Sequence, residues 1–123
     1  GLAGEPRVAA RALLAGTCRL IVLTLGADGA WAIGKTTEAF APSLPVTVVD
    51  TVGAGDCFFA GFLAAMQAAR LVDALREGVP PHAQLAEALQ HAAICAAISV
   101  QRTGCVPPTW SEARRFAGRA HAG

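Results

Sequence analysis

A glycine-rich turn between an apolar run and a helix-forming run constrains this chain more than any other feature. The turn reads Asp50-Thr51-Val52-Gly53-Ala54-Gly55-Asp56. The four β-branched residues of 46–49 precede it, and an apolar run rich in alanine and phenylalanine follows it over 57–66. This pattern predicts a strand, a turn and a helix. Two glycines let the backbone turn sharply and come close to a ligand.

Such a turn is suited to binding an anion. The first N–H groups of a helix have no partner within the helix, and they lie at the positive end of its dipole. A phosphate group binds well there. Asp56 adds a carboxylate at the same place, and phosphoryl transfer needs both donors for the phosphate charge and a base for the attacking hydroxyl. The alternative is structural, since Asp is also a preferred N-cap residue.

The rest of the chain predicts a layered α/β domain. In chain order we expect a helix over 5–15 that ends at Gly16, strands over 20–25, 30–33, 36–41 and 46–49, and helices over 54–69, 82–100 and 110–120. The run 20–25 is apolar without alternation, which is typical of a strand buried on both faces in a parallel sheet. Gly61 weakens its helix unless another element packs closely there. Thr109 and Glu112 are spaced as a capping box.

Composition narrows the class of protein. The chain has 123 residues, of which 54% are hydrophobic and 15% charged, as expected for one globular domain with a core. A net charge of +1 gives no reason to expect a nucleic-acid partner. The longest apolar runs are too short to span a bilayer, and no signal peptide is visible. The four cysteines lack CxxC spacing, so we expect reduced thiols, no zinc site and a cytoplasmic location.

Residues 50–63 resemble the C-terminal signature of the ribokinase-like, or PfkB, carbohydrate kinases. That signature is an Asp-Thr pair, a Gly-Ala-Gly-Asp turn, an aromatic residue and an Ala-Gly pair, and every position is filled here. The turn Thr24–Gly29 resembles the nucleotide loop of the family, and the alanine-rich helix running into Arg102-Thr103-Gly104 resembles its C-terminal end. The resemblance implies a ribokinase-like three-layer α/β/α fold.

The resemblance covers nearly all of the chain but well under half of a complete family member. Residues 1–123 would then form the C-terminal nucleotide-binding and catalytic portion. The sugar-binding part, the lid and the family's Asn-Glu motif for Mg²⁺ would lie upstream. Gly1 at the start and Met66 as the single methionine fit a piece of a longer protein.

The resemblance also implies roles for individual positions. Asp56 would take the proton from the sugar hydroxyl, and the backbone N–H groups of Gly53, Ala54 and Gly55 would form the anion hole. The positions that would lie against the nucleotide are Thr24, Gly26, Gly29 and Ala93. Ala93 stands where many members carry Asn near the adenine, so the preferred nucleotide is left open. In some members a monovalent cation such as K⁺ is held by positions that match Asp50, Val52, Ser99, Arg102 and Gly104.

The implied reaction is ATP- and Mg²⁺-dependent phosphorylation of a sugar hydroxyl. A fructokinase-like or 2-keto-3-deoxygluconate-kinase-like enzyme is expected, homodimeric at full length, with sugar and ATP as its ligands. The isolated chain is expected to be inactive. A kinase for a nucleoside or a vitamin, and a non-catalytic nucleotide-binding fragment, are alternatives.

A further alternative is a P-loop nucleotide hydrolase, because Gly29–Thr36 satisfies the pattern G-x-x-x-x-G-K-[ST]. That mechanism needs a flexible loop followed by a helix that begins at the lysine. The four middle residues here are apolar and strand-like, and the residues after Lys35 have no helical pattern. We therefore interpret the match as chance, with Lys35 a solvated charge at a turn.

Overall fold

The computed structural model describes residues 4–14, 18–76, 78, 80–104 and 107–122. Its elements in chain order are α1 (Gly4–Ala12), β1 (Leu20–Thr24), the 3₁₀ turn η1 (Gly26–Asp28), β2 (Ala30–Gly34), β3 (Glu38–Ala41), α2 (Ala54–Ala68), the 3₁₀ turn η2 (Asp73–Arg76), α3 (His82–Val100) and α4 (Trp110–Ala122). The predicted order of helix, strands and three helices is confirmed. No helix within the described ranges has the length and apolar character needed to cross a bilayer.

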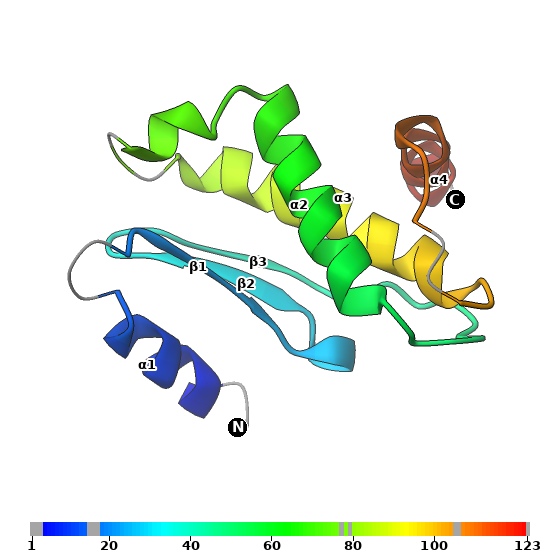
Figure 1. Ribbon diagram of the computed structural model, residues 1–123, viewed down its shortest axis with the longest axis horizontal. Coiled ribbons are helices and arrows are strands. Elements are labelled where there is room, and N and C mark those ends of the chain that lie inside the picture. The colour runs from blue at the N-terminus through cyan, green and yellow to red at the C-terminus, as the bar shows by residue number, and fades with distance from the viewer. Residues whose placement is uncertain (1–3, 15–17, 77, 79, 105–106, 123) are drawn as a thin grey trace.

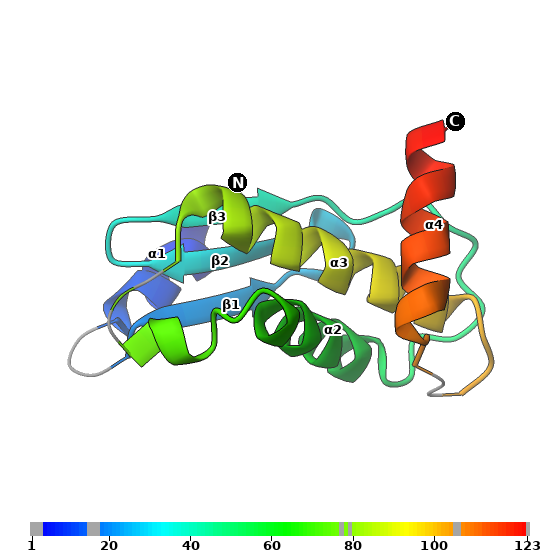
Figure 2. The same ribbon diagram turned by 90° about the horizontal axis from the view of Figure 1, so that it is seen from above.

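The molecule has three layers. Helix α1 covers one face of the sheet, and α2 and α3 cover the other (Figure 1). The sheet has the order β1-β2-β3 and is antiparallel, with Leu20 opposite Gly34 and Ala30 opposite Ala41. Figure 2 shows α2 and α3 lying along the sheet, with α4 crossing the C-terminal end of α3.

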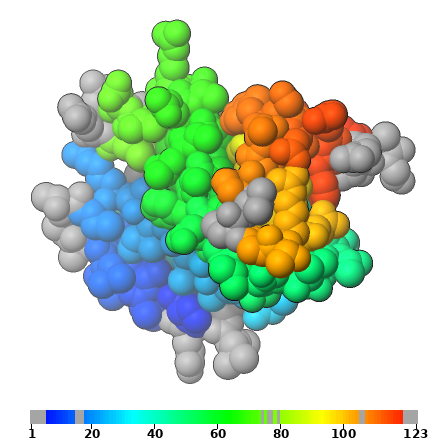
Figure 3. Space-filling view, turned by 45° about the vertical axis from the view of Figure 1, so that its right-hand side comes forward, coloured from blue at the N-terminus to red at the C-terminus, as the bar shows by residue number. Residues whose placement is uncertain are grey.

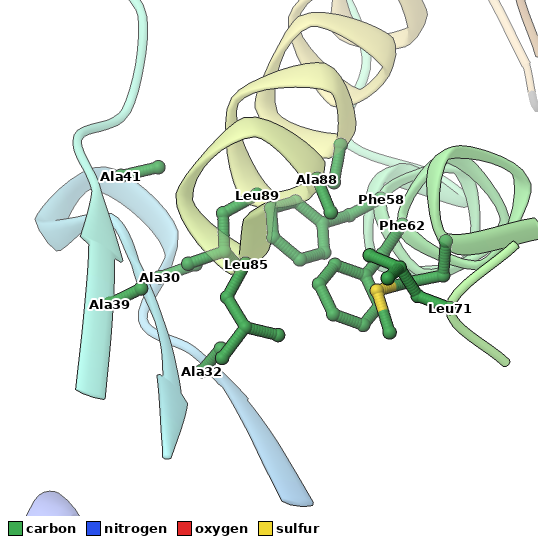
Figure 4. Packing of buried hydrophobic residues seen from close by; sticks show 12 residues of the cluster. Ala30, Ala32, Ala39, Ala41, Phe58, Phe62, Leu71, Leu85, Ala88 and Leu89 are labelled. Carbon is green, nitrogen blue, oxygen red and sulfur yellow. The ribbon is translucent and has the colours of Figure 1, made fainter. Parts of the chain in front are cut away.

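The main core lies between the sheet and the α2–α3 pair. Phe58 and Phe62 of α2 meet Leu85 and Leu89 of α3, which face the alanines of β2 and β3 (Figure 4). Alternate residues of a strand face opposite sides, so Ile33 of β2 packs toward α1 instead. The small side chains on the inner face of the sheet let the helices approach it closely.

Two strand predictions were wrong in part. Residues 46–49 form no strand; Val48 and Val49 are each 59% exposed, and the N–H groups of Val49 and Asp50 both donate to the Val100 carbonyl. β-branched composition favours a strand only where a neighbouring strand is present to pack against. The run 20–25 does form β1, but β1 pairs antiparallel and is only partly buried. Its unbroken apolar character reflects a sheet covered on both faces, which an antiparallel pairing also allows.

Other boundaries differ by a few residues. Helix α1 ends at Ala12, and β3 begins at Glu38. Gly16, the predicted end of the first helix, lies outside the described residues. The capping box is confirmed, because Thr109 Oγ1 accepts from the Glu112 N–H and Glu112 Oε1 accepts from the Thr109 N–H, both at 3.1 Å.

Candidate functional site

A cavity of about 530 Å³ opens beside the N-terminus of α2. Its walls are the turn that contains η1, the loop after β3, the start of α2 and the C-terminal half of α3. All four residues predicted to contact a nucleotide line it, as do two of the three residues predicted for the anion hole: Thr24, Gly26, Gly29, Ala93, Ala54 and Gly55. The volume falls within the range of roughly 300–1,000 Å³ that is usual for small-molecule and cofactor sites.

Glycine is required at one wall of this cavity. Gly26 and Gly29 have φ of 56° and 91°, in the left-handed region. The turn is closed by hydrogen bonds from the Leu25 N–H to the Gly29 carbonyl at 2.8 Å and from the Gly29 N–H to the Gly26 carbonyl at 3.1 Å. A Cβ at position 29 would lie 2.6 Å from the Ala41 carbonyl oxygen. The turn therefore joins β1 to β2 and also places backbone atoms that carry no side chain at the cavity wall.

The glycine-rich turn before α2 presents helix N–H groups at the cavity. Gly53 is the N-cap residue, with φ 74° and ψ 6° and no side-chain capping bond. The Cys57 N–H donates to the Gly53 carbonyl at 2.9 Å as the first bond of the helix, so the N–H groups of Gly55 and Asp56 precede it. The Ala54 N–H donates to the Thr51 carbonyl at 3.2 Å.

Asp56 lies exposed in the first turn of α2, immediately after the cavity-lining Gly55. Because Gly53 is the N-cap, the alternative that Asp56 caps the helix is wrong. Gly53 and Asp56 flank the cavity-lining pair in sequence but are not themselves part of the cavity wall. Cys57, the next residue in α2, is buried.

Asp50 ties the glycine-rich turn to the end of α3. Its carboxylate accepts from the Val52 N–H at 3.0 Å and from the Gly104 N–H at 2.8 Å. The backbone N–H of Val52, and then that of Gly104, hold the pKa of Asp50 below its usual value of 3.8. Figure 3 shows the segment before α2 (green) lying against the end of α3 and the loop after it (yellow to orange).

Of the five residues predicted to hold a monovalent cation, three are joined by hydrogen bonds through the Asp50 carboxylate. Asp50, Val52 and Gly104 are joined by the hydrogen bonds just described. Ser99 is fully buried in α3, and its Oγ has no hydrogen-bond partner among the described residues. The Arg102 side chain instead pairs with Glu112 of α4, beside a second hollow of about 430 Å³. Across the described part of the chain, no group of three or more His, Cys, Asp or Glu is placed to hold a metal ion.

The Walker-like stretch forms a strand. Gly29–Thr36 spans β2 and the turn after it, and Lys35 is exposed there, outside the cavity wall. The residues after Lys35 lead into β3 and not into a helix. The stretch therefore lacks the geometry of a P-loop, and the interpretation of the match as chance is confirmed.

Sequence reasoning missed one face of α3. Ala96, Ala97 and Val100 line the cavity together with Ala93, at helical spacing. The alanines at 88 and 92 lie instead in the core between the sheet and the α2–α3 pair. The signal that separates the two faces is the position of each alanine relative to Leu85 and Leu89, which point into the core.

Comparison with known proteins identifies the family. Residues 2–112 match the pfkB family carbohydrate kinases. A fructokinase from Rhizobium leguminosarum bv. trifolii is 40% identical over 94 residues, which cover 68% of this chain and 29% of that protein. The aminoimidazole riboside kinase of Salmonella typhimurium is 39% identical over 89 residues, covering 72% of this chain and 25% of that protein.

A solved structure described as a ribokinase II from Escherichia coli, in complex with ATP and Mg²⁺, superposes with a TM-score of 0.74. It is 28% identical, and the match covers 93% of this chain and 33% of the other. The chain thus spans about a quarter to a third of the length of these three proteins. With the family signature, the three layers and the cavity in agreement, the chain belongs to the pfkB family of carbohydrate kinases.

Proposed function

We propose that this chain is the C-terminal nucleotide-binding and catalytic portion of an ATP-dependent sugar kinase. The observation that carries the proposal is the cavity of about 530 Å³ that ends at the N-terminus of α2, where Asp56 lies next to the cavity wall. A nucleotide in the cavity would place its phosphates at the helix N–H groups. A sugar hydroxyl approaching from outside the cavity would then meet the exposed carboxylate.

The proposed step moves one phosphoryl group. The Asp56 carboxylate takes the proton of the sugar hydroxyl, and the hydroxyl oxygen forms a bond to the γ-phosphorus. The bond from the γ-phosphorus to the bridging oxygen breaks, and ADP leaves with that electron pair. The N–H groups at the start of α2, with the positive end of the helix dipole, stabilise the charge on the transferred group. Gly53 in the left-handed region sets the direction in which these N–H groups point.

ATP fits the cavity by volume and by the donors at the helix start. Mg²⁺ would supply charge neutralisation at the phosphates when bound. Such ions are usually held by the phosphates with one or two carboxylates and water, so they do not need an all-protein cage. We propose that its protein ligands lie upstream of Gly1, with the sugar-binding part.

The substrate class we propose is a sugar with a primary or secondary hydroxyl, fructose first. A similar protein is named fructokinase, which favours this choice. A riboside is the second candidate, because another relative of comparable identity is named aminoimidazole riboside kinase. A screen of fructose, 2-keto-3-deoxygluconate and ribosides against the full-length protein separates these candidates.

The decisive experiment is Asp56→Asn in the full-length protein, measured by coupled ADP release with fructose. We expect turnover to fall by about 10²–10⁴-fold, the usual contribution of a general base, with little change in ATP affinity. Asp73→Asn, an exposed aspartate at the start of η2, is the matched control and should leave turnover unchanged. Lys35→Ala should also leave it unchanged, since Lys35 lies outside the cavity wall. Unchanged turnover in Asp56→Asn would refute the proposed base.

The proposed division of the protein has a test of its own. The isolated chain should bind ATP but should not phosphorylate sugars, because it lacks the part that we propose binds them. Rapid sugar phosphorylation by the 123 residues alone would contradict this division. The coding sequence upstream of Gly1 provides an independent check, because it should contain a glycine-rich sugar-binding segment and an Asn-x-x-Glu motif.

A further inference from the structure

We propose that the nucleotide cavity does not distinguish adenine from guanine strongly, so that the kinase uses both ATP and GTP. The inference rests on the proposed function of the cavity. It comes from the chemistry of the cavity wall, which can pack against a purine but has few fixed groups with which to read its polar edge.

The wall is almost free of polar side chains. Among the described residues that line the cavity, three carry a side-chain oxygen, Thr24, Ser43 and Thr51, and none carries a charge or an amide. Thr51 belongs to the glycine-rich turn, where the phosphates would lie. Two hydroxyls, from the end of β1 and from the loop after β3, are therefore left for the base and the ribose.

A hydroxyl is a poor discriminator between the two purines. Adenine presents an amino donor at the 6-position, and guanine presents a carbonyl acceptor there. A Ser or Thr hydroxyl can donate or accept a hydrogen bond, and its proton rotates to suit the partner. The same two side chains can thus bond to either base.

In the α3 and η1 parts of the wall, the backbone is also largely committed. On the α3 face, Ala93, Ala96 and Ala97 lie inside the helix, where backbone groups bond within the helix. The Val100 carbonyl accepts from the N–H groups of Val49 and Asp50. In the η1 turn, the Gly26 and Gly29 carbonyls accept from the N–H groups of Gly29 and Leu25. These groups are poorly placed to enforce one base.

The composition of this wall determines how strongly the cavity can distinguish ATP from GTP. A site that must hydrogen-bond a particular group rejects an analogue lacking it by about 10⁴–10⁵-fold, whereas an apolar wall discriminates by about 10–200-fold for a change of one methylene group. Adenine and guanine are similar in size and both stack as purines. We therefore expect dissociation constants for ATP and GTP within about tenfold of each other. CTP should bind more weakly than either, because its single ring buries less apolar surface.

The first measurement is displacement of a fluorescent ATP analogue from the 123-residue chain by ATP, GTP and CTP. Similar affinities for the two purine nucleotides, with CTP weaker, support the inference. A preference for ATP of more than about tenfold overturns it and leaves the nucleotide site and the proposed kinase function standing. Absence of binding by every nucleotide overturns the nucleotide site, and with it both proposals.

The second measurement tests the hydroxyls. Thr24→Val and Ser43→Ala should weaken the binding of ATP and of GTP by equal factors, so the ratio of the two dissociation constants should stay constant. Ser111→Ala removes an exposed hydroxyl on α4, outside the cavity wall, and is the matched control. A selective loss of ATP binding of more than about tenfold in either cavity variant would show that a hydroxyl reads the base, against the inference. The ratio of kcat/KM for ATP and GTP in the full-length kinase should agree with the binding ratio.

Discussion

The contact between α2 and α3 at Gly61 gives a prediction whose size can be worked out from the structure. A Cβ at position 61 would lie 2.8 Å from Cys95 Sγ, 3.0 Å from Cys95 Cβ and 3.3 Å from Ala92 Cα. Rotation of Cys95 can move the sulfur, but the other two atoms move only if the helices separate. Overpacking of this kind costs about 1–3 kcal/mol.

Helix propensity acts in the opposite direction. Alanine in a helix interior is favoured over glycine by about 0.8–1.0 kcal/mol. Gly61→Ala should therefore lower the free energy of unfolding by a net value between about 0 and 2 kcal/mol. Gly118→Ala in α4 is the matched control, because no atom lies within 4 Å of its added Cβ and only the propensity gain remains. The difference between the two variants should then be about 1–3 kcal/mol, which isolates the steric cost.

The assay is urea unfolding of the chain followed by far-UV circular dichroism, with the slope against denaturant checked for constancy. The cost of Gly61→Ala should be smaller in a Cys95→Ala background, because the nearest atom has been removed. Equal increases in stability for Gly61→Ala and Gly118→Ala would refute the packing argument, because they would leave propensity as the sole effect.

Two further predictions concern the C-terminal part of the fold. Asp50→Asn should weaken the hydrogen bond from the Gly104 N–H and reduce the loss of stability in acid. Because the pKa of Asp50 is lowered, the contribution of its carboxylate to stability is present above pH 3.8 and is lost as the pH falls below that value. The urea midpoints at pH 7 and pH 3 should therefore lie closer together in the variant than in the wild type, and identical pH dependence in the two proteins would count against this role. Thr109→Ala should destabilise α4 by about 1 kcal/mol through loss of the capping bond to the Glu112 N–H; unchanged helicity and urea midpoint would contradict it.

Helices could be predicted well because their signals are local. The range of α3 agrees with its prediction at both ends, and α2 differs by one residue at its C-terminal end. The capping residues, the alanines and the spacing of the phenylalanines all act within one or two turns of the chain. Gly61 was expected to need a close neighbour, and Cys95 is that neighbour.

Strand pairing could not be predicted in the same way, because it depends on what lies beside each segment. The β-branched run 46–49 has the composition of a strand but no partner strand among the described residues, and the Val49 N–H donates to the Val100 carbonyl at the end of α3 instead. The run at β1 was apolar enough for a parallel sheet, yet the short turn at η1 returns the chain antiparallel. The composition of β1 indicated a strand covered on both faces, whereas the direction of its partner strand was set by the length of the connection.

The glycines that line the site could be predicted from the sequence, whereas the other residues of its walls were harder to predict. The η1 turn and the start of α2 are 25 or more residues apart in sequence, and the resemblance to the family predicted that both would lie against ATP. The face of α3 that completes the cavity was not separated from its core face, because both faces are made of alanine and the positions of Leu85 and Leu89 are what distinguish them. The roles of Asp56 and of the anion hole stay predictions.

The bonds that hold Asp50 also set an order of events in folding. The Asp50 carboxylate accepts a hydrogen bond from Gly104, which lies 54 residues further along the chain. The Asp50 N–H donates to the Val100 carbonyl, which is almost as distant in sequence. Closing a loop of that length is slow compared with forming either helix. The glycine-rich turn therefore cannot form these hydrogen bonds until the whole of α3 and the loop after it have emerged from the ribosome. A chain that is cut short before Gly104 would retain every residue of the glycine-rich turn and lack the anchor that holds it in position.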